Sequence, residues 1–170
     1  MNRHYTTKEY LEKLDILRTY YQHPAITTDV IVGFPEETKE EFQTTQEFLS
    51  KAAFAQMHIF KYSVRKGTKA EKMQQVPEPV KAERSDCLLK LEKELEKNYR
   101  KLFEGAKQEV LLEEPVQVNG KEYWIGHNER YVKIGIEKTK ENEALLESNR
   151  ILQVIVNNCG EQGMLLGKLC

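Results

Sequence analysis

The hydrophobic period of this 170-residue chain changes at Gly105. Before this glycine, apolar residues recur every three or four positions in several segments, which is the spacing of amphipathic helices. After it, apolar and polar residues alternate in short runs that turn residues interrupt, which is typical of short β-strands. The sequence therefore predicts an α/β region up to Gly105 and an all-β region over residues 106–170.

A strand–helix–strand pattern lies inside the α/β region. Residues 26–32 and 56–62 are rich in β-branched and aromatic side chains, and a capping box of Thr38 and Glu41 begins the helical segment between them. This order predicts a βαβ unit with parallel strands, the first of them covered on both faces. Two parallel strands neither close a barrel nor make a doubly wound sheet, so we expect the first hundred residues to be a piece of something larger, either the C-terminal segment of a longer protein or a truncated product.

The remaining segments complete the predicted architecture. A capping box of Thr6 and Glu9 predicts a helix over residues 6–22, and a leucine seam predicts a linking helix over residues 80–105. Asn119-Gly120 is a strong hairpin signal, because both residues tolerate positive φ. Five or six short strands over residues 106–170 predict a small antiparallel β-barrel of OB-like or SH3-like size.

Composition excludes several classes of protein. The net charge is −1, so the chain lacks the excess of basic residues that marks a strongly basic nucleic-acid binder. No apolar run approaches the roughly 18 residues of a membrane span. The three cysteines, Cys87, Cys159 and Cys170, are far apart and odd in number, which argues against a disulfide framework or a local metal site. We expect a protein of the reducing cytoplasm.

The ends of the two predicted parallel strands are the first candidate site. Ligands of parallel barrels bind at the C-terminal strand ends, which here are Gly33-Phe34 and Tyr62-Ser63. Alternation along the first strand turns Asp29 inward, where a carboxylate needs a partner. Asp29 is equally explained as a structural acid, and Gly33 as a simple turn residue.

Several longer motifs resemble one known family. Residues 1–105 are similar to the last third of the radical S-adenosylmethionine domain of the methylthiotransferases, and residues 106–170 are similar to their TRAM domain. The matching motifs are MNRHYT at 1–6, AITTDVIVGFPEET at 25–38, MHIFKYSVRKGTKA at 57–70, MQQVPEPVKAERSDCLLKLEKE at 73–94, YWIGHNERYVKI at 123–134 and LLGKL at 165–169. Together they cover essentially the whole chain. The resemblance implies that residues 1–79 are a segment of a partial TIM-like barrel.

The resemblance implies a methylthio transfer to an adenine carbon of tRNA. It implies S-adenosylmethionine and two 4Fe-4S clusters as cofactors, and the motif at 57–70 most resembles the branch that acts on threonylcarbamoyladenosine beside the anticodon. The isopentenyladenosine and ribosomal-protein branches remain alternatives, as does a non-catalytic RNA-binding or scaffold fragment. The cluster-binding cysteine motifs of the family are not in this sequence, so we expect the chain to be inactive without the N-terminal part of the enzyme as its partner.

The resemblance also assigns site residues. It places Ile31 and Gly33 near the adenine of S-adenosylmethionine, and we expect the cofactor wall to comprise Asp29, Ile31, Gly33, Phe34, Tyr62 and Ser63. Glu36 stands where the family usually has glycine, so either this residue is strained or the turn is rebuilt. Arg3 is similar to a family arginine near the same barrel mouth.

Aromatic and basic residues indicate where RNA could bind. We expect Trp124, His127, Arg130 and Lys133 to contact RNA, because small barrels stack bases on aromatic rings beside a basic track. We also expect Arg65 and Lys66 to lie at the mouth of the parallel barrel, where an RNA phosphate binds. Two alternatives to RNA binding are structural: the basic run near Arg65 is a solvated loop, and Trp124 and Tyr131 fill the barrel core.

Overall fold

The computed structural model describes residues 4–160 and 163–170. Arg3 therefore lies outside the described residues. The chain divides into two compact units, residues 1–96 and residues 97–170. Among the helices of the described residues, none has the length and apolar character to span a membrane.

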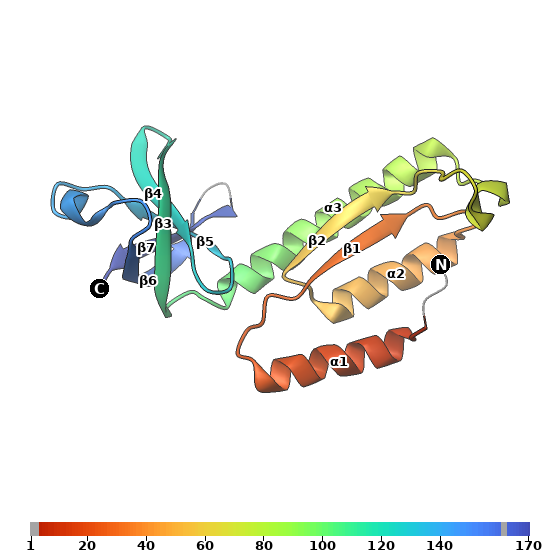
Figure 1. The fold of residues 1–170 in the computed structure, drawn as a ribbon, viewed down its shortest axis with the longest axis horizontal. Helices are drawn as coiled ribbons and strands as arrows, with labels where there is room; N and C mark the ends of the chain where they lie inside the picture. The colour runs from red at the N-terminus through yellow and green to blue at the C-terminus, as the bar shows by residue number, and fades with distance from the viewer. Residues whose placement is uncertain (1–3, 161–162) are drawn as a thin grey trace. The chain divides into compact units, whose positions relative to one another are not determined.

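The first unit contains the predicted βαβ pattern (Figure 1). Strands β1 and β2 are parallel and pair in register from Thr27 with Gln56 to Val32 with Lys61. The elements are α1 (Thr7–Tyr20), β1 (Thr27–Val32), α2 (Lys39–Ala52), β2 (Gln56–Lys61), η1 (Lys69–Lys72) and α3 (Glu78–Lys101), whose last turn belongs to the second unit.

Both predicted capping boxes are present. The Thr6 hydroxyl accepts the N–H of Glu9 at 3.2 Å, and the Glu9 carboxylate accepts the N–H of Thr6 at 2.7 Å. Thr38 and Glu41 repeat this arrangement at the start of α2, at 3.1 and 2.8 Å. Each box satisfies N–H groups that a helix start leaves without a partner, so the two helices begin where the local sequence predicts.

One face of the β1–β2 sheet carries the core of this unit. Val32 and Met57 are buried in a cluster with Leu49 of α2 and Leu88 of α3. The other face is exposed, and Ile31 and Phe60 on it are 38% and 53% exposed. Within the described residues the helices cover only one face of β1, because side chains of α1, α2 and α3 pack into the same cluster.

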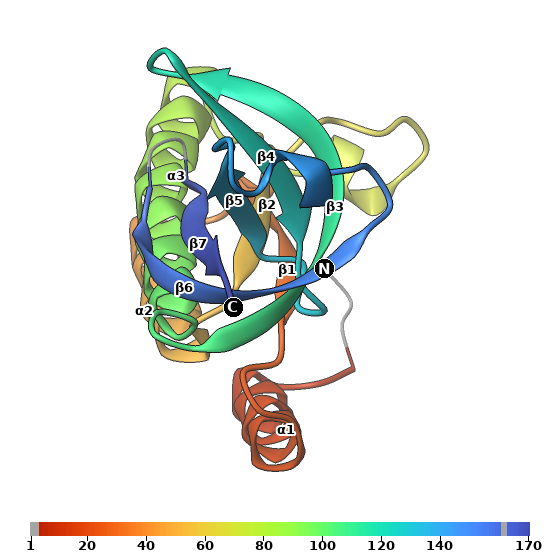
Figure 2. The ribbon, with the colours of Figure 1, turned by 90° about the vertical axis from the view of Figure 1, so that its left-hand side faces the viewer.

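The second unit is a five-stranded mixed sheet in the described residues, and its strand order, β3-β4-β5-β7-β6, closes into a barrel (Figure 2). Its elements are β3 (Lys107–Val118), β4 (Lys121–His127), β5 (Lys133–Glu137), η2 (Glu143–Leu145), β6 (Ile151–Cys159) and β7 (Leu165–Leu169). The two predicted strands at 107–114 and 116–118 are one long strand, β3, with an irregularity between Leu112 and Glu114.

The prediction of an antiparallel barrel is wrong at one seam. Strands β5 and β7 are parallel, and the other neighbouring pairs among these strands are antiparallel. A closed ring with an odd number of strands cannot alternate direction throughout, so one parallel pair is unavoidable. The predicted hairpin is confirmed, since Asn119 and Gly120 join β3 to β4 with φ values of 50° and 77°.

The inward-facing residues of these strands form a second core, separate from that of the first unit. Its fully buried members are Val110, Leu112, Ile134, Ile136, Val154, Val156 and Leu165. In β3 and β6 they alternate with the exposed residues Leu111 and Ile155, which is the period of 2 that the sequence shows after Gly105.

Candidate functional site

A cavity of about 600 Å³ lies in the first unit. Side chains from α1, β1, α2 and the loop after β1 line it. Three of the six residues predicted for the cofactor wall are among them, namely Asp29, Ile31 and Phe34. The other three, Gly33, Tyr62 and Ser63, lie at the neighbouring strand ends and do not line this cavity.

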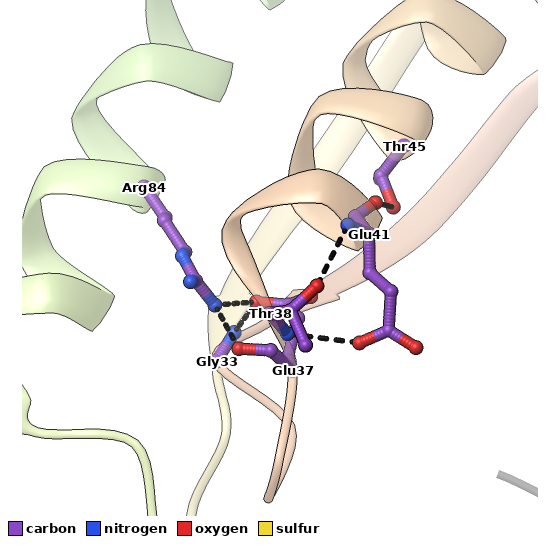
Figure 3. Close-up of polar contacts among 6 residues, drawn as sticks. All are labelled: Gly33, Glu37, Thr38, Glu41, Thr45 and Arg84. Atoms are coloured by element: carbon purple, nitrogen blue, oxygen red, sulfur yellow. Dashed lines mark hydrogen bonds and ion pairs between the residues drawn. The ribbon is translucent and has the colours of Figure 1, made fainter.

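Hydrogen bonds within the chain hold the loop between β1 and α2 (Figure 3). The N–H of Gly33 donates to the Glu37 carboxylate at 2.8 Å. The same carboxylate forms an ion pair with Arg84 of α3, and the Arg84 guanidinium also donates to the carbonyl oxygen of Glu37 at 3.0 Å. The side chains of Glu37 and Arg84 are 13% and 10% exposed, so this pair is largely shielded from water.

Two features favour glycine at position 33: the dihedral angle φ of its backbone and the close packing of a side chain from α3. Its φ is +67°, a region that side chains rarely adopt, and a Cβ there would collide with the side chain of Lys81. The resemblance places Gly33 near the adenine of S-adenosylmethionine, and in the structure the atoms nearest to the position of a Cβ belong to the side chain of Lys81.

Lys81 also holds the end of β2. Its ammonium donates to the carbonyl oxygen of Tyr62 at 3.2 Å and lies 5.8 Å from the centre of the Tyr62 ring. The Tyr62 ring packs edge-on against Phe34, with centroids 5.1 Å apart. Lys81 and Arg84 are therefore positioning residues for both strand ends.

Sequence reasoning missed Lys81 and Arg84. Both are buried although cationic, at 7% and 8% exposure. A signal was present, because positions 81, 84 and 88 lie on one helix face, and the third of them is the fully buried Leu88. A lysine and an arginine on the face that packs against the sheet indicate internal polar partners.

Glu36 is strained, as one of the two readings of this position predicts. Its φ is 66°, and its N–H donates to the carbonyl oxygen of Gln74 at 3.0 Å. The left-handed conformation costs a residue with a side chain about 1 to 2 kcal/mol. The exposed Glu36 lines the cavity together with Glu37, so the cavity wall carries an acidic rim beside Phe34.

The other candidates in this unit are exposed. Ser63, Arg65 and Lys66 lie in the loop after β2. Lys61, at the start of the basic run, forms an ion pair with Glu78 at 2.7 Å. This contact lowers the pKa of the Glu78 carboxyl, chiefly through the hydrogen bond from Lys61.

The thiols whose side chains the structure describes, those of Cys87 and Cys170, do not fit an iron–sulfur cluster. In the described residues no three His, Cys, Asp or Glu side chains come together as a metal site. Cys87 is partly buried on α3, where its sulfur accepts a hydrogen bond from the Gln46 amide at 3.0 Å, and Cys170 is exposed. A cluster needs several thiolates at close range.

The loop between β4 and β5 is built around the buried polar side chain of Asn128. Its amide oxygen accepts the N–H groups of Arg130 and Val132 at 3.0 and 2.9 Å, and its amide nitrogen donates to the Gln108 side chain at 2.8 Å. These bonds surround Tyr131, whose φ is 60°. Asn128 therefore fixes a turn that Tyr131 would rarely adopt alone.

The aromatic residues of the second unit divide between its interior and its surface. Tyr123 is buried and Trp124 packs against the barrel core, so the core alternative holds for Trp124. Tyr131 is 80% exposed and stacks on His127, with centroids 4.5 Å apart and planes 15° apart. The core alternative is therefore wrong for Tyr131, because its side chain points away from the strands' inner face.

Polar contacts fix the neighbours of this stack. The Nδ1 atom of His127 lies 2.7 Å from a carboxylate oxygen of Glu113. Arg130 is partly buried and lies 3.3 Å from the Glu129 carboxylate, and Lys133 is exposed at the start of β5. Three of the four RNA-binding candidates of this unit, His127, Arg130 and Lys133, thus lie in or directly beside one loop.

Comparison with known proteins gives a consistent set of relatives. No protein-family model matches the chain. The chain is 48% identical over 115 residues to the tRNA-2-methylthio-N(6)-dimethylallyladenosine synthase of Aquifex aeolicus, which is 67% of the chain and 26% of the relative. It is 36% identical over 155 residues to the threonylcarbamoyladenosine tRNA methylthiotransferase of Bacillus subtilis, or 90% of the chain and 34% of the relative.

A third relative carries the same name as the Bacillus subtilis protein. The threonylcarbamoyladenosine tRNA methylthiotransferase of Thermotoga maritima is 41% identical over 134 residues, or 78% of the chain and 30% of the relative. The chain thus spans about a quarter to a third of the length of these three relatives. Over this part of their length, the chain is homologous to the tRNA methylthiotransferases.

Proposed function

We propose that the chain is the C-terminal part of a radical S-adenosylmethionine tRNA methylthiotransferase. In this proposal residues 1–79 form a segment of the partial TIM-like barrel, residues 80–105 form a linking helix, and residues 106–170 form a TRAM-like barrel. The first segment contributes part of the cofactor wall, and the barrel binds tRNA. The reaction is methylthio transfer to an adenosine beside the anticodon, in the cytoplasm.

The length of one alignment carries this proposal. The Bacillus subtilis relative matches 155 residues, whereas the first unit has 96 residues and the second has 74. An alignment of that length extends across both units. The common ancestry therefore includes the combination of the α/β unit with the β unit, and a shared segment of one unit alone does not explain it.

The volume of the cavity beside β1, and the side chains that line it, support the proposal that this region is part of the cofactor-binding site. Ligand pockets commonly enclose roughly 300 to 1,000 Å³, and this one measures about 600 Å³. Asp29 and Glu36 supply carboxylates for the cationic groups of S-adenosylmethionine, and Phe34 and Ile31 supply apolar surface for its adenine. When bound, the cofactor supplies the radical chemistry, and the chain's own residues bind and orient it.

The iron–sulfur clusters belong to the rest of the enzyme in this proposal. In the part of the chain that the structure describes, no metal-binding group of side chains comes together, so no step of the reaction is assigned to its thiols. We propose that the chain is inactive alone. Lys81 and Arg84 support catalysis only indirectly, because they position the two strand ends that face the cofactor.

The substrate branch has two candidates. We propose threonylcarbamoyladenosine, because the relative of that name from Bacillus subtilis matches 90% of the chain. Dimethylallyladenosine is the second candidate, since the relatives of that name from Aquifex aeolicus and Caldicellulosiruptor saccharolyticus are 48% and 47% identical over about two thirds of the chain.

The test supplies the missing part in trans. The chain is mixed anaerobically with a separately expressed N-terminal part of the Thermotoga maritima relative, reconstituted with iron and sulfide, and given S-adenosylmethionine and tRNA. Mass spectrometry of the nucleosides is expected to show a methylthio product only when both parts are present. Two tRNA substrates, carrying threonylcarbamoyladenosine or dimethylallyladenosine, identify the branch. A methylthio product from the chain alone contradicts the proposed inactivity, and an absence of both products contradicts the proposed function.

A further inference from the structure

Tyr131 combines two features that are unfavourable for stability. It is 80% exposed, so its ring gains almost nothing from burial. Its φ of 60° is in the left-handed region, which aromatic residues rarely adopt. Strained residues of this kind persist where the surrounding structure enforces them, and they concentrate at functional sites. Asn128 enforces the conformation here, through its bonds to the N–H groups on both sides of Tyr131.

The ring of Tyr131 is held in a defined orientation. One ring face lies on the His127 imidazole, 4.5 Å away and tilted by only 15°. His127 is itself fixed by the contact of its Nδ1 atom with Glu113. The exposure of Tyr131 leaves the other face to solvent. A planar ligand can therefore stack there without displacing any protein group.

We propose that the stacked pair of Tyr131 and His127 is a platform for one unpaired nucleobase of RNA. This inference rests on the proposed tRNA-binding role of the second unit, and it identifies the residue on which a base stacks. Single-stranded bases bind proteins by stacking on aromatic rings, with cationic side chains beside them for the phosphates. Arg130 and Lys133 are adjacent in sequence to the stack and supply those cations.

The charges around the loop favour stacking over electrostatic attraction as the source of affinity. Glu113 contacts His127 and Glu129 contacts Arg130, so two carboxylates balance the two cations Arg130 and Lys133. A site with little net charge gains little from phosphate neutralisation. The platform therefore contributes a component of RNA affinity that salt hardly changes. Trp124, which packs against the barrel core, does not serve as a stacking residue.

The test uses fluorescence anisotropy of the full chain with a labelled single-stranded RNA that has the sequence of the anticodon loop. Tyr131→Asn removes the ring but keeps a residue that tolerates positive φ, so the loop retains its conformation. We expect it to weaken binding about tenfold, the typical effect of losing one stacked base. The salt dependence of binding stays unchanged. Tyr131→Trp is expected to retain the wild-type affinity.

A matched control removes an equally exposed tyrosine from the other unit. Tyr20 of α1 is also 80% exposed, and Tyr20→Asn is expected to leave RNA affinity unchanged. Lys133→Ala provides the opposite pattern, because losing a cation lowers the salt dependence by about one charge. Thermal unfolding of each variant verifies that the second unit stays folded.

An abasic scan of the RNA completes the experiment. Wild-type chain is expected to lose about tenfold in affinity when one particular base is removed, and Tyr131→Asn to lose nothing further at that position. If wild-type chain binds RNA and Tyr131→Asn binds it equally well, the platform is overturned while the tRNA-binding role stands, and a protein becomes the candidate occupant of the stack. If wild-type chain does not bind RNA, the proposed tRNA-binding role is overturned together with the platform.

Discussion

The sheets of the two units differ in whether their outer strands leave backbone hydrogen-bonding groups unpaired. In the described residues, β1 and β2 form a two-stranded parallel sheet, which leaves its outer edges and one face exposed. The sheet of the second unit closes on itself, so each of its strands has two neighbours. Closure removes the unpaired backbone groups that make an edge prone to association.

The difference is visible in equivalent side chains. Ile31 of β1 is 38% exposed, whereas Ile134 of β5 is fully buried. Both are isoleucines one residue inside the end of a strand, and the surroundings of the two strands differ. The first unit therefore depends for its stability on the helices that cover one face and on the polar contacts of α3, while the second unit depends on its enclosed core.

The largest expected effect follows from this pair of residues. Ile134→Ala is expected to lower the free energy of unfolding of the second unit by about 3 kcal/mol, because it leaves a cavity in a closed core. Ile31→Ala is the control and is expected to cost the first unit less than about 1 kcal/mol. Urea unfolding followed by the fluorescence of Trp124, the single tryptophan, measures the first value, and hydrogen exchange measures the second. Equal losses would contradict the contrast between an open and a closed sheet.

The polar contacts of α3 give the next largest effect. Arg84→Met leaves the Glu37 carboxylate buried without its partner, and we expect a loss of about 3 kcal/mol in the first unit. Hydrogen exchange is expected to accelerate at β1 and the following loop, with the second unit unchanged. Arg65→Met, at an exposed arginine of the same unit, serves as the control. The double variant Glu37→Gln with Arg84→Met should recover part of the loss, and no recovery would show that Arg84 acts through packing alone.

A smaller effect of opposite sign is expected at Glu36. Glu36→Gly relieves the left-handed backbone, and we expect the first unit to gain about 0.5 to 1 kcal/mol after the greater freedom of glycine in the unfolded chain is subtracted. Glu47→Gly, on the exposed side of α2, should instead cost about 1 kcal/mol. Urea unfolding of the first unit, followed by hydrogen exchange, compares them. A loss at both positions would show that Glu36 has a compensating interaction.

The smallest effect concerns alkaline pH. Partial burial raises the pKa of Tyr99 from its ordinary value of 10 to about 12. The unfolded chain therefore ionises this phenol first, so its contribution to stability is present below pH 10 and is lost as the pH rises toward 12. Tyr99→Phe should remove this part of the pH dependence. Urea midpoints of the second unit between pH 9 and pH 11 provide the measurement, and identical slopes for both proteins would contradict it.

Features that depend on neighbouring residues could be predicted. The capping boxes of Thr6 with Glu9 and of Thr38 with Glu41 involve residues three positions apart, and the Asn119-Gly120 turn needs only two residues. The spacing of apolar residues likewise predicted the βαβ unit. These signals are local, so they persist in the sequence without knowledge of the rest of the fold.

The candidate site was predicted less completely. Asp29, Ile31 and Phe34 were expected at the cofactor wall and do line a cavity, whereas Lys81 and Arg84, which hold the strand ends, were not expected. They lie 48 and 47 positions from the glycine and the glutamate that they contact, Gly33 and Glu37. Contacts at such a separation depend on where a helix packs, which periodicity alone does not specify.

The sequence alone determined the order and type of the elements, the change from helices to strands at Gly105, and the starts of α1 and α2. The tertiary structure decided which strands meet, that β5 and β7 run parallel, and that Trp124 turns to the core while Tyr131 turns to solvent. The physical reason is the range of the interactions. Caps and turns are complete within a few residues, whereas ring closure and side-chain burial depend on segments that only folding brings together.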